Sequence, residues 1–208
     1  MADIASESTG SGSDCEWPQI SDLVPVAVPT AHGMVYAQLA NVGAENLLVI
    51  SSGKRVALPV VRFHSSCAFG EAIGATDCDC GVQLEAAIAA IAREGGVVTY
   101  AWEEGRGIGI AGKMAALALQ QAEGLDTAEA FGRLGHEPEP RDFDNHVAAL
   151  RRMFDGAAVR LASANPAKEA ALFRAGIEVR ERIKLSVPLT EERAAYVAGK
   201  VLALGHHP

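Results

Sequence analysis

The pattern of apolar and polar residues divides the chain into a polar tail, a β-rich part and a part that alternates helices with strands. Residues 1–16 are mainly Ser, Gly and acidic residues with almost nothing to bury, which predicts a disordered tail. From about residue 23, short apolar runs alternate with turn formers, and their prolines suit strand ends and edge strands. This alternation predicts β-strands within residues 23–33, 34–40, 46–52 and 56–66.

A helical period begins after Cys80. Within residues 81–94, the apolar side chains that share one face of the predicted helix are Leu84, Ile88, Ile91 and Ala92. Gly95 and Gly96 supply a helix end signal, and residues 97–102 then predict a strand.

The rest of the chain continues the alternation. A Gly-rich stretch from Gly105 leads into a helix from about Ile110 to Glu123, and residues 128–143 are expected to form a loop around two prolines. Residues 157–187 predict a strand, a helix and a further strand. In that helix Asn165 is expected as N-cap with Pro166 at the first position, and Gly176 as C-cap after about Ala175.

These elements predict a mixed α/β fold, in which a β-rich N-terminal half precedes alternating helices and strands, with one domain over residues 17–208. The formal charge of −8 has the wrong sign for a protein that coats nucleic acid or anionic lipid. No signal peptide and no apolar stretch of about 20 residues is present, so the expected location is the cytoplasm. Structural disulfides are rare there, and Cys15 in the tail is expected to be an incidental exposed thiol.

Three of the four cysteines lie close together in the sequence. Cys67, Cys78 and Cys80 form a C-x10-C-x-C pattern, and thiolates are preferred ligands of Zn²⁺. Three protein ligands leave the fourth tetrahedral position for a water molecule with a pKa near 7, which is a nucleophile for hydrolysis. Two alternatives stay open: His64 could complete a closed structural site, or the cysteines could be reduced, buried thiols.

Several short motifs occur together and in a fixed order. They are RFHSSC, DCDCGVQLEAA, EEGRGIG, GLDTAEA, PRDF and NPAK, and with their neighbours they extend from about Pro25 to His206. In this order and at these intervals the chain resembles the GTP cyclohydrolase II family. The resemblance implies an enzyme dependent on Zn²⁺ and Mg²⁺ that opens the imidazole ring of GTP, releases C8 as formate and loses pyrophosphate, as the first step toward riboflavin. It also implies a homodimer.

The resemblance carries functional roles onto individual residues. Cys67, Cys78 and Cys80 would be the zinc ligands, Arg141 a nucleophile toward the α-phosphate and Glu139 a proton acceptor. The substrate-binding residues would be Arg62, His64, Ser65, Ser66, Gln83, Glu104, Gly105, Arg106, Thr127, Ser163 and Lys168.

These residue types suit a guanine nucleotide. Arg forks, a Lys charge and backbone N–H groups suit a triphosphate with its Mg²⁺, and a carboxylate such as Glu104 can accept the two Watson–Crick donors of guanine. Taken singly, Lys168 would be a solvated helix lysine, Glu139 an exposed loop acid and Arg141 half of a surface pair with Asp142.

Some positions depart from the family motifs. Ser66 stands where Glu is usual, Asp77 where a basic residue is usual, and Trp102-Glu103 where Arg-Gln is usual. Glu139 replaces Asp, Ser163 replaces Thr, and Ala164 replaces the first Asn of N-N-P-x-K. Leu117 stands four residues after Lys113, where a tyrosine is common.

Leucine cannot orient a water molecule or an intermediate as a phenol can, so hydrolysis could stop at a formamidopyrimidine nucleotide. Two alternatives to the ordinary reaction therefore remain. One is a diverged paralogue that stops there or uses another nucleotide, and the other is a non-catalytic zinc- or nucleotide-binding protein. His206 and His207 are expected to be a solvated tail rather than a metal site.

Overall fold

The structure, a computed structural model, describes residues 16–43 and 45–185 together with residues 187, 190, 194 and 201. The predictions about Cys15, about most of the N-terminal tail and about the His206-His207 pair lie outside the described residues.

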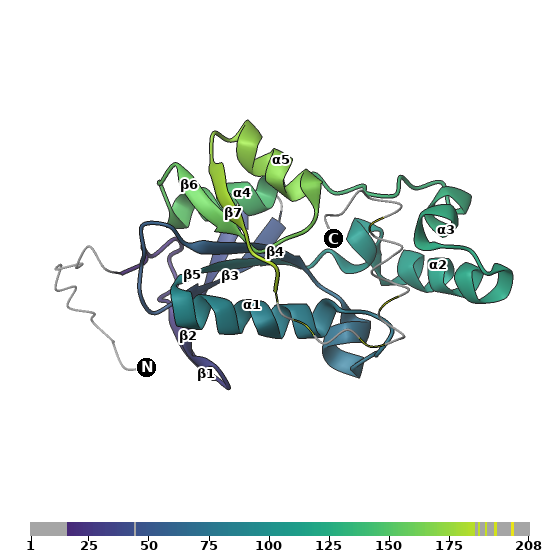
Figure 1. Cartoon of the computed structure of the whole chain (residues 1–208), viewed down its shortest axis with the longest axis horizontal. Coiled ribbons are helices and arrows are strands. Elements are labelled where there is room, and N and C mark those ends of the chain that lie inside the picture. Colours follow the sequence, from purple (N-terminus) through teal and green to yellow (C-terminus); the bar gives the residue numbers. More distant parts are fainter. Residues whose placement is uncertain are drawn as a thin grey trace, which may run out of the picture.

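Seven strands form one mixed sheet (Figure 1). In their order across the sheet they are β1 (Val26–Thr30), β2 (Gly33–Val42), β3 (Glu45–Ser52), β5 (Gly96–Ala101), β4 (Val60–Ser65), β6 (Ala158–Leu161) and β7 (Glu178–Arg182). Pairing is antiparallel from β1 to β5 and parallel from β5 to β7. The predicted strands and the mixed α/β class are confirmed.

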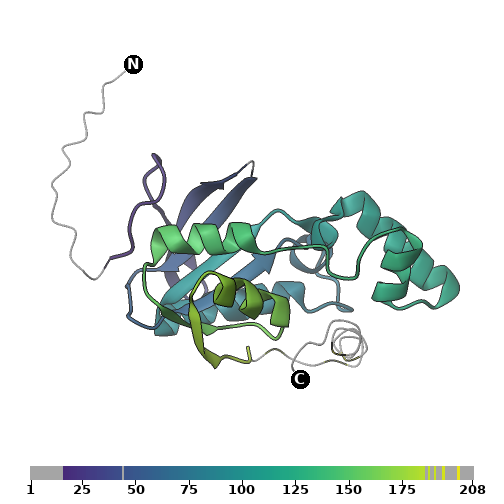
Figure 2. The ribbon, with the colours of Figure 1, turned by 90° about the horizontal axis from the view of Figure 1, so that it is seen from above.

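Three helices cover the two faces of the sheet. Helix α1 (Cys80–Glu94) lies on one face, and α4 (Asp144–Met153) and α5 (Pro166–Arg174) lie on the other (Figures 1 and 2). Consecutive residues of β4 point to opposite faces, so Val60 packs with Ile91 of α1, whereas Val61 packs in the core that holds α4 and α5. Each face of the sheet is therefore buried against helices.

Two further helices project from one end of the sheet. Helices α2 (Gly109–Glu123) and α3 (Thr127–Arg133) share a small apolar cluster made of Ala116, Ala130 and Phe131, with partly buried neighbours (Figure 2). The expectation that residues 128–143 form a loop is wrong for α3. A capping box between Asp126 and Glu129 starts this helix, and this signal can be found in the sequence.

Other element boundaries follow the predicted signals closely. Helix α1 ends at its C-cap Gly95 as predicted, and the side chain of Asn165 caps α5 by accepting from the Ala167 N–H. The C-cap of α5 is Ala175, and Gly176 follows it with φ +71°, so the predicted cap is displaced by one residue. None of the described helices is long and apolar enough to cross a membrane.

The carboxyl ends of three parallel strands meet at one edge of the sheet. Ser65 of β4 pairs with Ala101 of β5, and the Ser66 N–H donates to the Ala101 carbonyl at 2.8 Å. Strand β6 is parallel to β4, so the segment that leads into α5 leaves the sheet at the same edge. In open α/β sheets this edge is where ligands bind.

Candidate metal centre and active site

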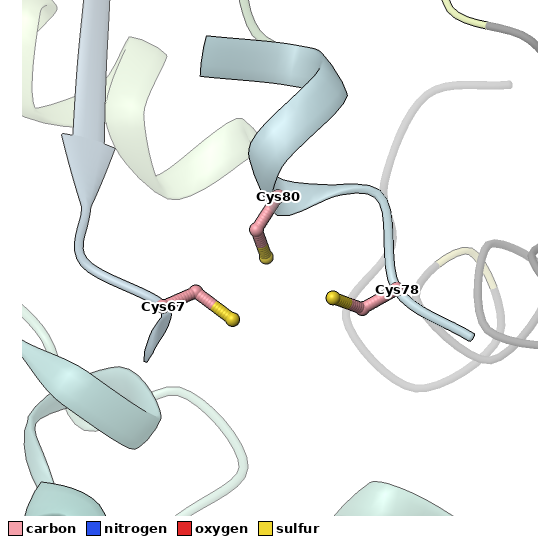
Figure 3. A group of neighbouring side chains, drawn as sticks. All are labelled: Cys67, Cys78 and Cys80. Carbon is pink, nitrogen blue, oxygen red and sulfur yellow. The ribbon is translucent and has the colours of Figure 1, made fainter. Parts of the chain in front are cut away.

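The three clustered cysteines converge at the carboxyl edge of β4. Cys67 follows β4, whereas Cys78 precedes α1 and Cys80 is its first residue. Their sulfur atoms lie within 4.8 Å of one another and point toward a common centre (Figure 3). A tetrahedral zinc ion, with Zn–S bonds of about 2.3 Å, places its sulfur ligands about 3.8 Å apart. The cluster therefore fits a zinc ion bound by three thiolates.

The surroundings of Cys67 favour its thiolate. Hydrogen bonds from Cys78 and Cys80, and then from Lys113, lower the pKa of Cys67 although burial opposes ionisation. The Lys113 Nζ lies 3.0 Å from the Cys67 sulfur, and the Gly70 N–H donates to that sulfur at 3.4 Å. The same contact with Cys67 raises the pKa of Cys78. The chain thus supplies positive charge and donors around the Cys67 thiolate.

Close packing of two backbone segments brings the cysteines together. Between Cys67 and Cys78, residues Phe69–Ile73 form a π-helical turn, η1. A Cβ atom on Gly81, in the first turn of α1, would lie 2.3 Å from the Gly70 carbonyl oxygen of η1. Only a residue without a side chain fits there, so Gly81 allows η1 and α1 to approach.

His64 is bound elsewhere and is not a fourth member of the cluster. Its Nε2 lies 3.0 Å from the Glu71 carboxylate, its Nδ1 accepts from the Arg62 Nε at 3.3 Å, and its ring stacks on Tyr100. Burial lowers the pKa of His64 to about 4. Among the described residues, the candidate ligand group consists of the three cysteines, so the closed site with His64 is not formed.

Glu71 organises this side of the site and was not found from the sequence. Its carboxylate accepts hydrogen bonds from the Cys67 N–H at 2.9 Å and the Tyr100 hydroxyl at 2.7 Å, besides its contact with His64. Burial opposes its ionisation, but His64 and Tyr100 outweigh it, so the pKa of Glu71 lies below its ordinary value. No motif marks this residue, because its partners are distant in the sequence.

Arg62 is directed into the protein. Its three guanidinium nitrogens donate to His64, to the Ala162 carbonyl and to the Gln83 side chain, which in turn donates to Asp79. Burial lowers the pKa of Arg62 to about 10. In this structure Arg62 and Gln83 therefore connect β4, β6 and the start of α1.

Arg141 and Glu139 form a bidentate ion pair. Both residues lie in the segment that connects α3 with α4. Arg141 Nε donates to one oxygen of Glu139 at 2.7 Å, and Arg141 Nη2 donates to the other at 2.6 Å. Arg141 Nη1 donates to the Ser65 hydroxyl at 3.0 Å, and Asn165 donates to Glu139 at 3.0 Å. Only 12% of the Arg141 side chain and 17% of the Glu139 side chain are exposed, so the alternatives of a surface pair and an exposed loop acid are wrong.

The charge state of this pair follows from its contacts. Burial opposes ionisation of Glu139, but Arg141, Arg106 and Asn165 outweigh it, and the pKa of Glu139 lies below its ordinary value. Glu139 is therefore an anion that is already hydrogen-bonded to the guanidinium from which it would accept a proton.

Lys168 contacts the same aromatic ring as Arg141. It is only 8% exposed, its Nζ donates to the Phe63 carbonyl at 2.7 Å, and it lies over the Phe143 ring, which also receives Arg141. The alternative of a solvated helix lysine is wrong. Nearby, the Ser163 hydroxyl accepts from the Asn165 N–H at 3.1 Å.

The loop after β5 connects the cysteine side of the site with the side that holds Arg141 and Glu139. Glu104 accepts from Lys113 at 2.7 Å and from the Ala68 N–H at 2.6 Å, beside Cys67. Gly105 and Arg106 follow with φ of +61° and +57°, a conformation that disfavours a side chain at both positions.

The Arg106 side chain turns away from the cysteines. It donates to the Pro138 carbonyl at 2.7 Å and lies 5.3 Å from the Phe131 ring centroid. Thr127, the first residue of α3, lies in the projecting unit of α2 and α3 and is half-buried.

Comparisons with known proteins agree with this arrangement. The sequence model of the family GTP cyclohydrolase II matches residues 22–184. Riboflavin biosynthesis protein RibBA of Bacillus mycoides (strain KBAB4) is 39% identical over 192 residues, which are 90% of this chain and 47% of that protein. The protein of the same name from Staphylococcus epidermidis (strain ATCC 35984 / DSM 28319 / BCRC 17069 / CCUG 31568 / BM 3577 / RP62A) is 38% identical over 184 residues, which are 87% of this chain and 46% of that protein. The chain spans about half the length of the curated relatives that it matches.

The family that matches is the one that the motifs resemble, and the match covers the described sheet and all of its helices from β1 to β7. The chain belongs to the GTP cyclohydrolase II family and is an enzyme of the hydrolase class.

Proposed function

We propose that this chain hydrolyses the imidazole ring of GTP, with zinc in the cysteine cluster, and releases formate and pyrophosphate in a step toward riboflavin. One observation carries the proposal: a cluster of three thiol ligands among the described residues and a largely buried Arg–Glu pair occupy the same sheet edge of a GTP cyclohydrolase II family member. The name of the relatives, riboflavin biosynthesis protein, supports a role in riboflavin synthesis.

Cys67, Cys78 and Cys80 would hold the zinc ion, which, when bound, supplies Lewis-acid chemistry for hydrolysis at C8 of the purine. Lys113 would partly neutralise the excess negative charge of three thiolates, because it lies 3.0 Å from one of them. Glu104 would read the guanine edge. Its oxygens already accept hydrogen bonds from Lys113, the Ala68 N–H and the Gly105 N–H. A carboxylate has about four acceptor positions, so the two guanine donors would replace at least one of these contacts.

Arg141 and Glu139 would act at the α-phosphate. A guanidinium nitrogen of Arg141 would give its proton to Glu139 and form a bond to the α-phosphorus, while the bond from the α-phosphorus to the bridging oxygen breaks and pyrophosphate leaves. Water would then cleave the new P–N bond and release the nucleotide as a monophosphate, and the proton would return from Glu139 to Arg141. Mg²⁺, when bound to the triphosphate, would stabilise the charge of the leaving pyrophosphate. Glu139 can accept the Arg141 proton because two of the guanidinium nitrogens lie within 2.7 Å of it. Lys168 and Arg106 add positive charge near His146 and Glu139.

Other proposed residues would position these groups or contact the substrate from the rim. His64, Arg62 and Gln83 form a hydrogen-bonded chain behind the cysteines. Ser65, Ser66, Gly105, Thr127 and Ser163 would contribute hydroxyl or backbone donors to the nucleotide. A homodimer remains the expected form of the enzyme on the basis of the family resemblance, and the cytoplasm remains its expected location.

A second candidate is a reaction that stops at the formamidopyrimidine nucleotide. Leu117 is a half-buried residue of α2, the helix whose Lys113 reaches Cys67. An apolar side chain in this helix offers no hydroxyl for the second hydrolytic step. A non-catalytic zinc protein is disfavoured by the cluster itself, which among the described residues has three ligands rather than the four of a structural site.

The test is to incubate the full chain, loaded with zinc and magnesium, with GTP and to measure formate, pyrophosphate and product mass together. Formate with a deformylated pyrimidine supports the first proposal, and a product that retains one formyl group supports the second. Arg141→Ala should abolish pyrophosphate release with unchanged zinc content, whereas the control Arg152→Ala, at an exposed position of α4, should retain turnover. No reaction with GTP would reject both.

A further inference from the structure

A buried histidine on α4 has one ring nitrogen without a hydrogen bond. His146 is fully buried and stacks on Phe63 with a centroid distance of 5.0 Å. Its Nδ1 lies 2.7 Å from the Thr99 hydroxyl of β5. Among the described residues, its Nε2 is the buried side-chain polar atom that lacks a hydrogen-bond partner. Such an atom is costly unless a nearby group compensates it.

The Nε2 atom faces the carboxylate of Glu103. The separation of 3.8 Å is within ion-pair range but too long for a hydrogen bond, and a shift of about 1 Å would close it. The same Glu103 oxygen accepts a hydrogen bond from the Ser65 hydroxyl at 2.8 Å. The Ser65 hydroxyl in turn accepts from Arg141 Nη1. A continuous series of polar contacts therefore runs from His146 to Arg141.

The charges fix the direction of each contact. Burial opposes ionisation of Glu103, but His146, Ser65 and Arg141 outweigh it and keep the pKa of Glu103 below its ordinary value. Burial lowers the pKa of His146, and the charges of Lys168 and Arg141 act in the same direction, against the opposing effect of Glu103. A neutral imidazole beside an anion is best placed with its proton on Nε2, so that Thr99 donates to Nδ1.

We propose that Glu103 and His146 are positioning residues for Arg141. His146 holds the Glu103 carboxylate in place, and Glu103 accepts a hydrogen bond from the Ser65 hydroxyl, so that a Ser65 lone pair faces Arg141 Nη1. Arg141 then has Nε and Nη2 directed at Glu139, its proton acceptor. The functional part of this inference rests on the proposed role of Arg141.

Matched variants separate positioning from packing. The amide nitrogen of glutamine can occupy the position of the His Nε2, whereas asparagine reaches only the position of Nδ1. His146→Gln therefore keeps a donor toward Glu103, and His146→Asn keeps only the contact with Thr99. Glu103→Gln keeps a hydrogen-bonding group near Ser65 but removes the charge. His136→Gln, at an exposed histidine, is the control.

The measurement is steady-state pyrophosphate release from GTP by the zinc- and magnesium-loaded protein. Glu103→Gln and His146→Asn should each lower kcat about tenfold with KM changed by less than about twofold, since Arg141 loses its position for the reaction while the residues proposed to bind the nucleotide remain. His146→Gln should stay within about threefold of the parent, and His136→Gln should match it. The double variant Glu103→Gln/His146→Asn should be no slower than either single variant, because the two residues act in series.

Equal losses in the Gln and Asn variants of His146, multiplicative losses in the double variant, or a change in KM alone would overturn the proposal. A second measurement is independent of turnover: the exchange of the Arg141 Nε–H with water, followed by NMR in the protein without substrate. This exchange should quicken in Glu103→Gln and stay slow in His146→Gln. If the parent releases no pyrophosphate from GTP, the proposed function fails, and unchanged exchange in Glu103→Gln separately rejects the positioning role.

Discussion

At the scale of the residue, the site depends on buried carboxylates that accept several hydrogen bonds at once. Glu71 receives the Cys67 N–H, the Tyr100 hydroxyl and His64, which come from three different segments. A carboxylate suits this position because both of its oxygens accept hydrogen bonds. The amide NH₂ group of a glutamine would instead face a hydrogen-bond donor. Glu71 therefore positions the backbone of the first cysteine.

Glu71→Gln should lower the free energy of unfolding by about 1–3 kcal/mol, because at least one buried donor loses its acceptor. It should also weaken zinc binding. The matched control is Glu85→Gln on the exposed surface of α1, which should change the free energy of unfolding by less than about 0.5 kcal/mol. Denaturant unfolding and zinc titration are the measurements, and equal effects of the two variants would contradict the role of Glu71.

Residues that belong to a sequence motif were predicted. Residues whose role depends on contacts between distant segments were missed. The cysteines, Arg141 and Glu139 were found from motifs, and the structure brings each set together. Glu71 and His146 carry no local signal, since their partners lie in other strands and their importance arises from burial. Pairing between polar groups that are far apart in the sequence depends on how the strands and helices pack in the folded protein.

At the scale of the element, the cysteine cluster depends on the close approach of η1 to α1. Helix α1 was predicted from its apolar period, and β4 from its short apolar run. The π-helical turn η1 was not predicted, because it is too short for a period and contains no buried residue. Helix α4 was missed between a loop and a strand, although His146, Val147 and Leu150 on it are buried.

Gly81→Ala should separate η1 from α1 and weaken zinc binding at least about tenfold, because its Cβ would meet the Gly70 carbonyl oxygen at 2.3 Å. Gly132→Ala is the matched control, since a Cβ there meets nothing within 4 Å and the residue lies in helix α3. This control should bind zinc as the parent does and be slightly more stable. Competition with a chromophoric chelator measures the affinity, and an unchanged value in Gly81→Ala would reject the packing argument.

At the scale of the whole molecule, one sheet joins an antiparallel half to a parallel half. The mixed class was predicted from the strand and helix patterns, but the strand order was not, because β5 lies between β3 and β4 through pairing of distant segments. The parallel half places the segments after β4, β5 and β6 at one edge. The antiparallel half has its own buried side chains, such as Leu47 and Val49, at a distance in sequence from the cysteines.

Removal of zinc by a chelator should loosen the cysteine segments and leave the antiparallel half folded. Hydrogen exchange should quicken in residues 66–81 and change little in β2 and β3, and the Tm should fall. Zinc at a hundredfold excess over its Kd would restore about 2.7 kcal/mol of stability. Cys67→Ser is the control that should not respond to the chelator, and uniform loosening of the whole sheet would contradict this division.

During synthesis on the ribosome, all three cysteines of the cluster emerge well before the last residues of the site. Its three cysteines lie in the segment from β4 through α1, and β5 follows directly to pair with β4. The other edge of β4 stays unpaired until β6 has been synthesised, and Asn165 and Lys168 emerge only after β6. A chain that stalls or ends before β6 would therefore contain all three cysteines, expose a strand edge prone to aggregation, and lack Asn165 and Lys168. Synthesis of β6 and the segment after it therefore both covers the free edge of β4 and supplies the last residues of the site.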